Sequence, residues 1–103
     1  MSKVVNIHKK KGVRPYFDVY IGRRVHYTEF QKNSIWYNPF TLKRWGDLSL
    51  KLYETYLRNS PELLNRLLEL KGKILGCWCK NQGNGKCHGD ILIKLLKEQI
   101  DKN

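Results

Sequence analysis

Residues 73–96 read KILGCWCKNQGNGKCHGDILIKLL. The first six are mostly apolar, as expected of a strand that is buried on both faces. Glycines at positions 83 and 85 indicate a turn, and apolar residues then recur at helical spacing from residue 90 to about residue 100. A strand, a loop and a helix in this order are typical of an α/β sheet, where functional residues gather in the loop that follows a strand.

Two other stretches are predicted strands. Residues 4–7 form a short β-branched run, and residues 18–25 are rich in β-branched and aromatic side chains. A basic loop punctuated by Gly12 and Pro15 separates them. A hairpin is therefore the simplest way to pair these two strands.

The middle of the chain has the periodicity of helices. Apolar residues between positions 48 and 57 fall on one face, behind Asp47 as a suitable N-cap. The sequence Ser-Pro-Glu at 60–62 is a typical start for a second helix. Its apolar face, which we expect in the core, consists of Leu63, Leu64, Leu67, Leu68 and Leu70. Together these patterns predict one α/β domain over residues 1–103, with a short mixed sheet of about three strands and three main helices.

The formal net charge of +11 is concentrated in the N-terminal part of the chain. Residues 1–45 carry ten Lys or Arg against Asp18 and Glu29, a net charge of +8. Such an excess favours nucleic acid or another polyanion as a partner, although it also serves solubility. The residues expected to contact phosphate are Lys9, Lys10, Lys11, Arg14, Arg23, Arg24, Lys43 and Arg44.

Residues 26–45 are unusually aromatic and have no clear period. Their rings either cover one face of the sheet or form a stacking platform for bases. Core packing is the better interpretation for Trp36 and Phe40. Polar residues near predicted strand ends and turns are candidates to line a pocket with Trp36, beside the cysteine loop: Asn6, Asp18 and Asn38.

All three cysteines lie close together, next to a histidine. Alternation along a strand puts Cys77 and Cys79 on the same side, and the glycine turn returns the chain to Cys87 and His88. Three thiolates and an imidazole form a common tetrahedral zinc site. We therefore expect one Zn²⁺ bound by these four residues.

A reactive thiol is the alternative to zinc. Cys87 precedes the final helix, whose N-terminus stabilises a thiolate and also suits a phosphate group. His88 and Asp90 would then be candidates for proton transfer. A third interpretation treats the cysteines as small buried apolar residues, which explains Cys77 well and His88 poorly.

The chain has no apolar run of the roughly 18 residues that a membrane span needs, and no signal-peptide core follows Met1. We expect a soluble, intracellular protein that does not bind membranes.

The motifs resemble those of domain-of-unknown-function family 4326, which occurs in bacteria, phages and large viruses. The resemblance rests on Val5-Asn6, on residues 18–23, on Ser34-Ile35-Trp36-Tyr37-Asn38-Pro39-Phe40, on residues 70–79 and on residues 87–92. It implies a small α/β domain whose motifs meet at one site, in the host cytoplasm if the protein is viral. Two departures are Lys80 in place of a proline, with a longer turn after it, and Tyr37 in place of a small residue.

Three functions follow from these observations as expectations. The first is a basic zinc protein that binds or helps process nucleic acid. The second is an enzyme or sensor of a nucleotide or phosphorylated ligand that uses Cys87. The third is a phage or viral module that binds a host protein.

Overall fold

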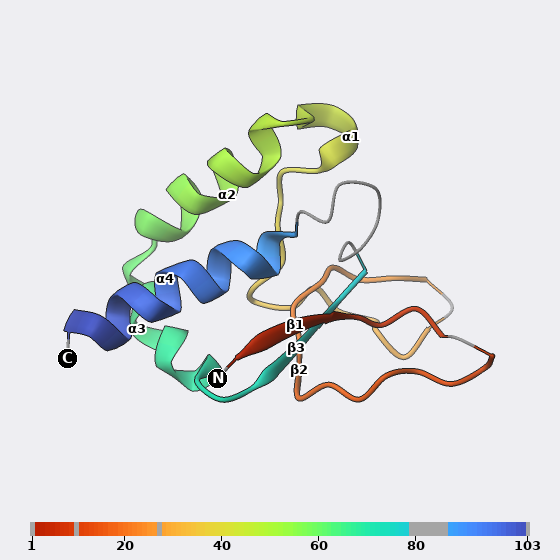
Figure 1. Cartoon of the computed structure of the whole chain (residues 1–103). Coiled ribbons are helices and arrows are strands. Elements are labelled where there is room, and N and C mark those ends of the chain that lie inside the picture. Colours follow the sequence, from red (N-terminus) through yellow and green to blue (C-terminus); the bar gives the residue numbers. More distant parts are fainter. Residues whose placement is uncertain (1, 10, 27, 79–86, 103) are drawn as a thin grey trace.

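Three strands form a single sheet in the computed structural model, which describes residues 2–9, 11–26, 28–78 and 87–102. They are β1 (Lys3–Asn6), β2 (Val19–Tyr20) and β3 (Ile74–Cys77), arranged in the order β1-β3-β2. Both pairs are parallel, so all three carboxyl ends point to the same edge (Figure 1). The expected three-strand α/β domain is confirmed, but its sheet is parallel throughout and not mixed as the sequence predicted.

The predicted hairpin between β1 and β2 is wrong, because β3 lies between these strands. A parallel arrangement needs a connection of about a dozen residues to bring the chain back to the start of the sheet. Residues 7–18 provide that length, and their described parts, 7–9 and 11–18, extend beyond the carboxyl edge and then return (Figure 1). The second strand is also shorter than the predicted 18–25, since pairing ends at Tyr20.

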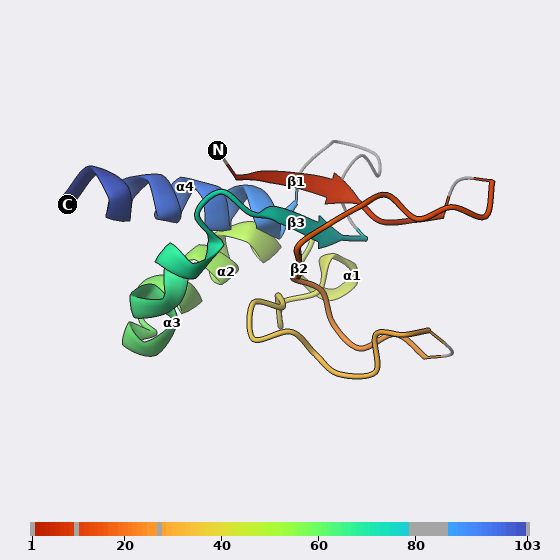
Figure 2. The same ribbon diagram turned by 90° about the horizontal axis from the view of Figure 1, so that it is seen from below.

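The helical segments lie together at one side of the sheet (Figures 1 and 2). They are α1 (Leu42–Trp45), α2 (Leu48–Arg58), α3 (Pro61–Arg66), the 3₁₀ segment η1 (Leu67–Leu70) and α4 (His88–Lys102). Helix α4 packs against α2, η1 and β1. The three main helical regions are thus those that the periodicity predicts, and none of the helices in the described part of the chain is long and apolar enough to cross a membrane.

One core joins β3 to the helices. Leu75 and Cys77 are fully buried there, together with Tyr53 of α2 and Leu92 of α4. Trp36 is also buried, which confirms its predicted core packing. These contacts hold the carboxyl end of β3 close to the first turn of α4.

Leu68 departs from the predicted leucine face, because 47% of its surface is exposed. The α-helix ends at Arg66, and the following 3₁₀ segment has three residues per turn. At that spacing Leu67 and Leu70 fall on the same side, and both are buried. The change of helix type therefore turns Leu68 outward.

Candidate functional site

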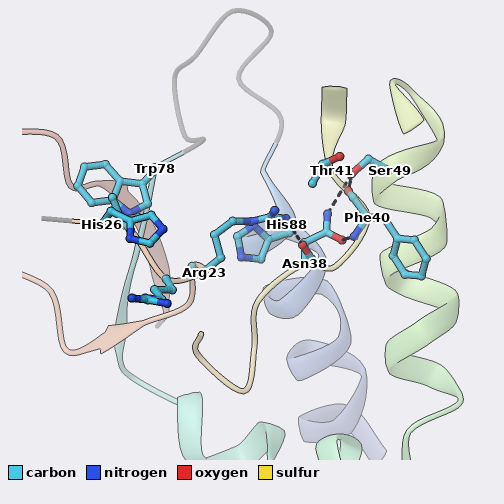
Figure 3. Close-up of a pocket in the computed structure, with 11 residues that line it drawn as sticks. Arg23, His26, Asn38, Phe40, Thr41, Ser49, Trp78 and His88 are labelled. Atoms are coloured by element: carbon cyan, nitrogen blue, oxygen red, sulfur yellow. Dashed lines mark hydrogen bonds between the residues drawn. The ribbon is translucent and has the colours of Figure 1, made fainter. Parts of the chain in front are cut away.

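A cavity of about 550 Å³ lies at the carboxyl edge of the sheet, where α4 begins (Figure 3). Its described lining comes from five places in the chain: residues 22–26 after β2, the turn at Asn38, Phe40 and Thr41, Ser49 on α2, Trp78 after β3, and His88 on α4. In Figure 3, Trp78 and His26 lie on one side and Phe40 and Ser49 on the other. Such a position is where parallel α/β sheets bind ligands.

His88 forms part of the cavity wall from the first turn of α4. Its Nε2 lies 2.7 Å from the carbonyl oxygen of Ile21. Because a carbonyl can only accept, Nε2 carries the hydrogen and the lone pair of the neutral ring is on Nδ1. Burial lowers the pKa of His88 below its usual value of 6.5, against the opposing effect of the Ile21 hydrogen bond. His88 is therefore a neutral imidazole at pH 7.

The Asn38 turn fixes the opposite wall. The Asn38 side chain accepts the Phe40 N–H at 2.9 Å and donates to the Ser49 hydroxyl at 3.0 Å. Ser49 is buried and donates in turn to the Phe40 carbonyl. Arg23 donates to the backbone carbonyl of Asn38, which holds this cation beside the cavity. The turn therefore positions two neutral groups, the Asn38 amide and the Ser49 hydroxyl, and also the Arg23 guanidinium group.

Arg23 and Arg24 follow β2 and are both exposed. The backbone N–H of Arg24 donates to the Asn33 side chain at 2.7 Å, which fixes this segment as well. Trp78 and Phe40 provide aromatic surface in the same cavity. The site thus combines two cations with two rings, a combination that suits a ligand with both an anionic and a planar part.

Cys77 and Cys87 directly precede Trp78 and His88 of the cavity lining, and both cysteines are buried. Their sulfur atoms are 2.9 Å apart, and the backbone N–H of Gly89 contacts the Cys87 sulfur at 3.3 Å. Two thiolates on one tetrahedral zinc ion would lie about 3.8 Å apart, given Zn–S distances of ~2.3 Å. The observed pair would have to separate to fit zinc.

The predicted zinc site includes Cys79, which lies outside the described residues. Within the described ranges, no group of three or more His, Cys, Asp or Glu side chains could hold a metal ion. His88 does have the hydrogen bond to a carbonyl that usually orients a zinc-binding imidazole. Zinc at Cys77, Cys79, Cys87 and His88 stays a prediction.

The four predicted pocket residues separate in the fold. Asn38 lines the cavity. Asn6 lies behind it, where its side-chain amide reaches the Trp78 carbonyl at 3.4 Å. Asp18 accepts from the N–H of Ile74, so it lies at the opposite end of β3, and hydrogen bonds from Tyr16 and Ile74 lower its pKa. Trp36 is in the core.

Arg14 is packed into the protein, unlike the other predicted phosphate contacts. It pairs with Glu29 at 2.8 Å, donates to the Ile7 carbonyl and lies over the rings of Phe30 and Trp78. Only 15% of its side chain is exposed. Arg14 thus supports the wall that carries Trp78.

The remaining basic candidates are at the surface. Lys9, Lys11, Lys43 and Arg44 are exposed, and Lys10 lies outside the described residues. Arg44 lies over the Trp45 ring, with its guanidinium carbon 5.4 Å from the ring centre. Contact of these side chains with phosphate stays a prediction.

Ser49, Thr41 and His26 line the cavity, but their sequence positions did not single them out. A signal for Ser49 was available, because it lies one turn before Tyr53 and two turns before Leu57, on the buried face of α2. A small polar residue on such a face needs a hydrogen-bonding partner. Thr41 and His26 lie in irregular segments, where periodicity gives no guide.

Comparison with known proteins identifies the family. A family model described as "Domain of unknown function (DUF4326)" matches residues 5–98. The chain belongs to this family. Uncharacterized protein R718 of Acanthamoeba polyphaga mimivirus is 39% identical over an alignment of 88 residues, which covers 78% of this chain and 67% of that protein. No solved structure matches this DUF4326 domain.

Proposed function

We propose that this DUF4326 domain binds a phosphorylated ligand of nucleotide size in the cavity beside His88. The observation that carries the proposal is the cavity itself, which is lined by Arg23 and Arg24 together with Trp78 and Phe40, at the carboxyl edge of a parallel sheet. Its volume of about 550 Å³ is within the usual range of small-molecule sites, roughly 300–1,000 Å³.

The two arginines are suited to the anionic part of the ligand. A guanidinium group can donate two parallel hydrogen bonds to one phosphate, and both arginines belong to a segment held by Asn38 and Asn33. Because these anchors already restrict the segment, little further ordering is needed on binding. Arg23 and Arg24 are therefore the proposed phosphate contacts.

The aromatic walls are suited to a planar ring. Phe40 is held by its backbone in the Asn38 turn, and Trp78 by a hydrogen bond from its indole N–H to the Tyr20 hydroxyl at 2.8 Å. Stacking on fixed aromatic groups adds affinity for any base with little sequence preference. A nucleotide has both required parts.

Calorimetric titration with the four ribonucleoside monophosphates and their parent nucleosides tests this proposal. We expect each monophosphate to bind more tightly than its nucleoside, and Arg23→Ala to lose roughly 10- to 100-fold in affinity for the monophosphate. Arg66→Ala is the matched control, because Arg66 pairs with Glu69 outside the cavity. Equal affinities for monophosphates and nucleosides, or no binding of either, would contradict the proposal.

Binding of single-stranded nucleic acid is the second candidate function. It is supported by the net charge of +8 over residues 1–45 and by the exposed Lys9, Lys11, Lys43 and Arg44. Arg44 and Trp45 together offer a cation and a ring to a passing strand. This function needs a surface that extends beyond the cavity.

Titration of a short oligonucleotide at increasing salt separates the two candidates. A strand bound through these side chains loses affinity as salt rises, and the Lys43→Ala/Arg44→Ala pair reduces the salt slope by about one to two. The same pair of substitutions leaves mononucleotide binding unchanged. An oligonucleotide affinity that is constant with salt rules out the second candidate.

A further inference from the structure

We infer that Cys77 and Cys87 form a reversible disulfide that joins the end of β3 to the start of α4. The inference rests on the two sulfur atoms and is independent of the proposed ligand. They are 2.9 Å apart, and a disulfide bond is about 2.05 Å long. Closing the bond requires an approach of about 0.9 Å.

The surroundings favour this pair. Cys77 ends β3, whose register with Asn6 of β1 holds it in place, and Cys87 is followed directly by α4. The N–H of Gly89 points at the Cys87 sulfur from 3.3 Å and stabilises negative charge there. In the proposed reaction Cys87 is the sulfur that attacks first.

The oxidant is a low-molecular-weight disulfide such as glutathione disulfide. The Cys87 thiolate attacks one of its sulfur atoms, which forms a mixed disulfide and releases one glutathione thiolate. The Cys77 thiolate then attacks the Cys87 sulfur and releases the second glutathione. The protein loses two thiol protons and two electrons. Glutathione disulfide accepts them and is reduced to two glutathione thiols.

The bond would have a direct structural consequence. Trp78 follows Cys77 and His88 follows Cys87, and both of these neighbours line the cavity. A disulfide would fix the separation of these two walls, whereas the reduced pair allows it to vary. Because both thiols are almost completely buried, the reaction requires a local opening and should be slow.

Mass spectrometry of the full chain, equilibrated in glutathione buffers from both the oxidised and the reduced side, tests the inference. After alkylation of remaining thiols and proteolysis, we expect a peptide pair linked through Cys77 and Cys87, which dithiothreitol removes. Cys79→Ser should still form this link, and Cys87→Ser should not. The readout needs no ligand, so failure of the proposed nucleotide binding leaves it intact.

Three results would overturn the inference. One is a link that contains Cys79 in place of Cys77 or Cys87. Another is the accumulation of mixed glutathione adducts without any internal link. The third is a chain that binds one zinc ion and keeps its thiols unreactive in oxidising buffer. The wild-type chain alone distinguishes these results, so the conclusion does not depend on whether each variant folds.

Discussion

Gly89 of the Cys-His-Gly-Asp motif is needed at its position because the first turn of α4 touches the sheet. A Cβ atom at residue 89 would lie 2.7 Å from a methyl carbon of Val4 and 2.9 Å from the terminal carbon of Ile21. These distances are too short for real carbon contacts, and the β-branched Val4 has few alternative rotamers. The glycine thus lets α4 approach the strands closely enough to place His88 in the cavity wall.

Gly89→Ala should therefore destabilise the protein by about 1–3 kcal/mol, the usual cost of overpacking. In a helix with open space around the residue, the same change would stabilise the protein by up to about 1 kcal/mol. The sign of the change in the free energy of unfolding therefore distinguishes close packing from open space. Chemical denaturation measures it, with Lys97→Ala at an exposed position of α4 as the control. An increase in the free energy of unfolding would contradict the close approach.

Arg14 illustrates how a basic residue can support a site without contacting the ligand. Its guanidinium group is shared between Glu29, the Ile7 carbonyl and two aromatic rings. Arg14→Ala should lower the free energy of unfolding by about 1–3 kcal/mol, because it removes charge-assisted hydrogen bonds and leaves the carbonyl unpaired.

Lys11→Ala is the matched control for Arg14→Ala, since Lys11 is an exposed cation of the same loop. We expect an effect within about 0.5 kcal/mol from this change. Equal thermal or chemical stability of the two variants would show that Arg14 is an ordinary surface cation.

At the scale of elements, a charged network holds α2 against α4. Lys94 of α4 contacts Glu54 of α2 at 3.0 Å, and Arg58 pairs with both Glu54 and Glu98 at 2.9 Å. The hydrogen bond from Lys94 is the largest cause that lowers the pKa of Glu54, and that from Arg58 lowers the pKa of Glu98. These side chains are partly exposed, so the network assists the apolar contacts of the same helices.

The lowered pKa values predict a pH dependence. Because folding lowers the pKa of these carboxyls, their contribution is complete above the ordinary value of 4.5 and is lost as pH falls through the folded value below it. Wild-type protein should exceed Glu54→Gln in stability by less than about 1 kcal/mol at pH 7.

Thermal melts between pH 3 and pH 7 check this prediction, with Asp101→Asn as a control that removes an exposed acid near the end of α4. The difference between wild type and Glu54→Gln should shrink below pH 4.5 and also at high salt. A difference that stays constant over this pH range would mean that the network does not contribute through charge.

Local sequence signals predicted the elements better than their pairing. The buried strand before Cys77, the Ser-Pro-Glu helix start and the α4 periodicity each reflect short-range preferences, and each element is present. The pairing of β1 and β2 was wrong because their order across the sheet depends on where β3 inserts, more than fifty residues later. Leu68 was misplaced because nothing in the leucine stripe marks the change to a 3₁₀ turn.

Local signals likewise predicted the site residues that lie close together in sequence, and failed where the position of a residue depends on the sheet topology. Cys77, Cys87 and His88 were expected together, since a strand and a helix that follow each other bring their ends close. Asn38 was recognised through its turn with Pro39. Asp18 was a candidate for the same pocket but lies at the other end of β3, because the parallel arrangement puts the start of β2 far from the cysteines.

At the scale of the whole molecule, the long connections provide most of the site, and the first turns of α2 and α4 complete it with Ser49 and His88. The segments after β1 and β2 extend past the carboxyl edge, whereas α2 and α4 pack on one another away from it (Figures 1 and 2). A ligand in the cavity would therefore contact five separate parts of the chain. This arrangement makes the cavity, rather than any one motif, the centre of the proposed function.

The most direct test of that claim is to map backbone amide chemical shifts by NMR during titration with a ribonucleoside monophosphate. We predict that the largest changes occur at residues 22–26, at Asn38 to Thr41 and at His88, with smaller changes in the exposed basic segments that carry Lys9 and Arg44. Arg23→Ala should reduce all of them together. Changes confined to those basic segments, with none around His88, would contradict the account.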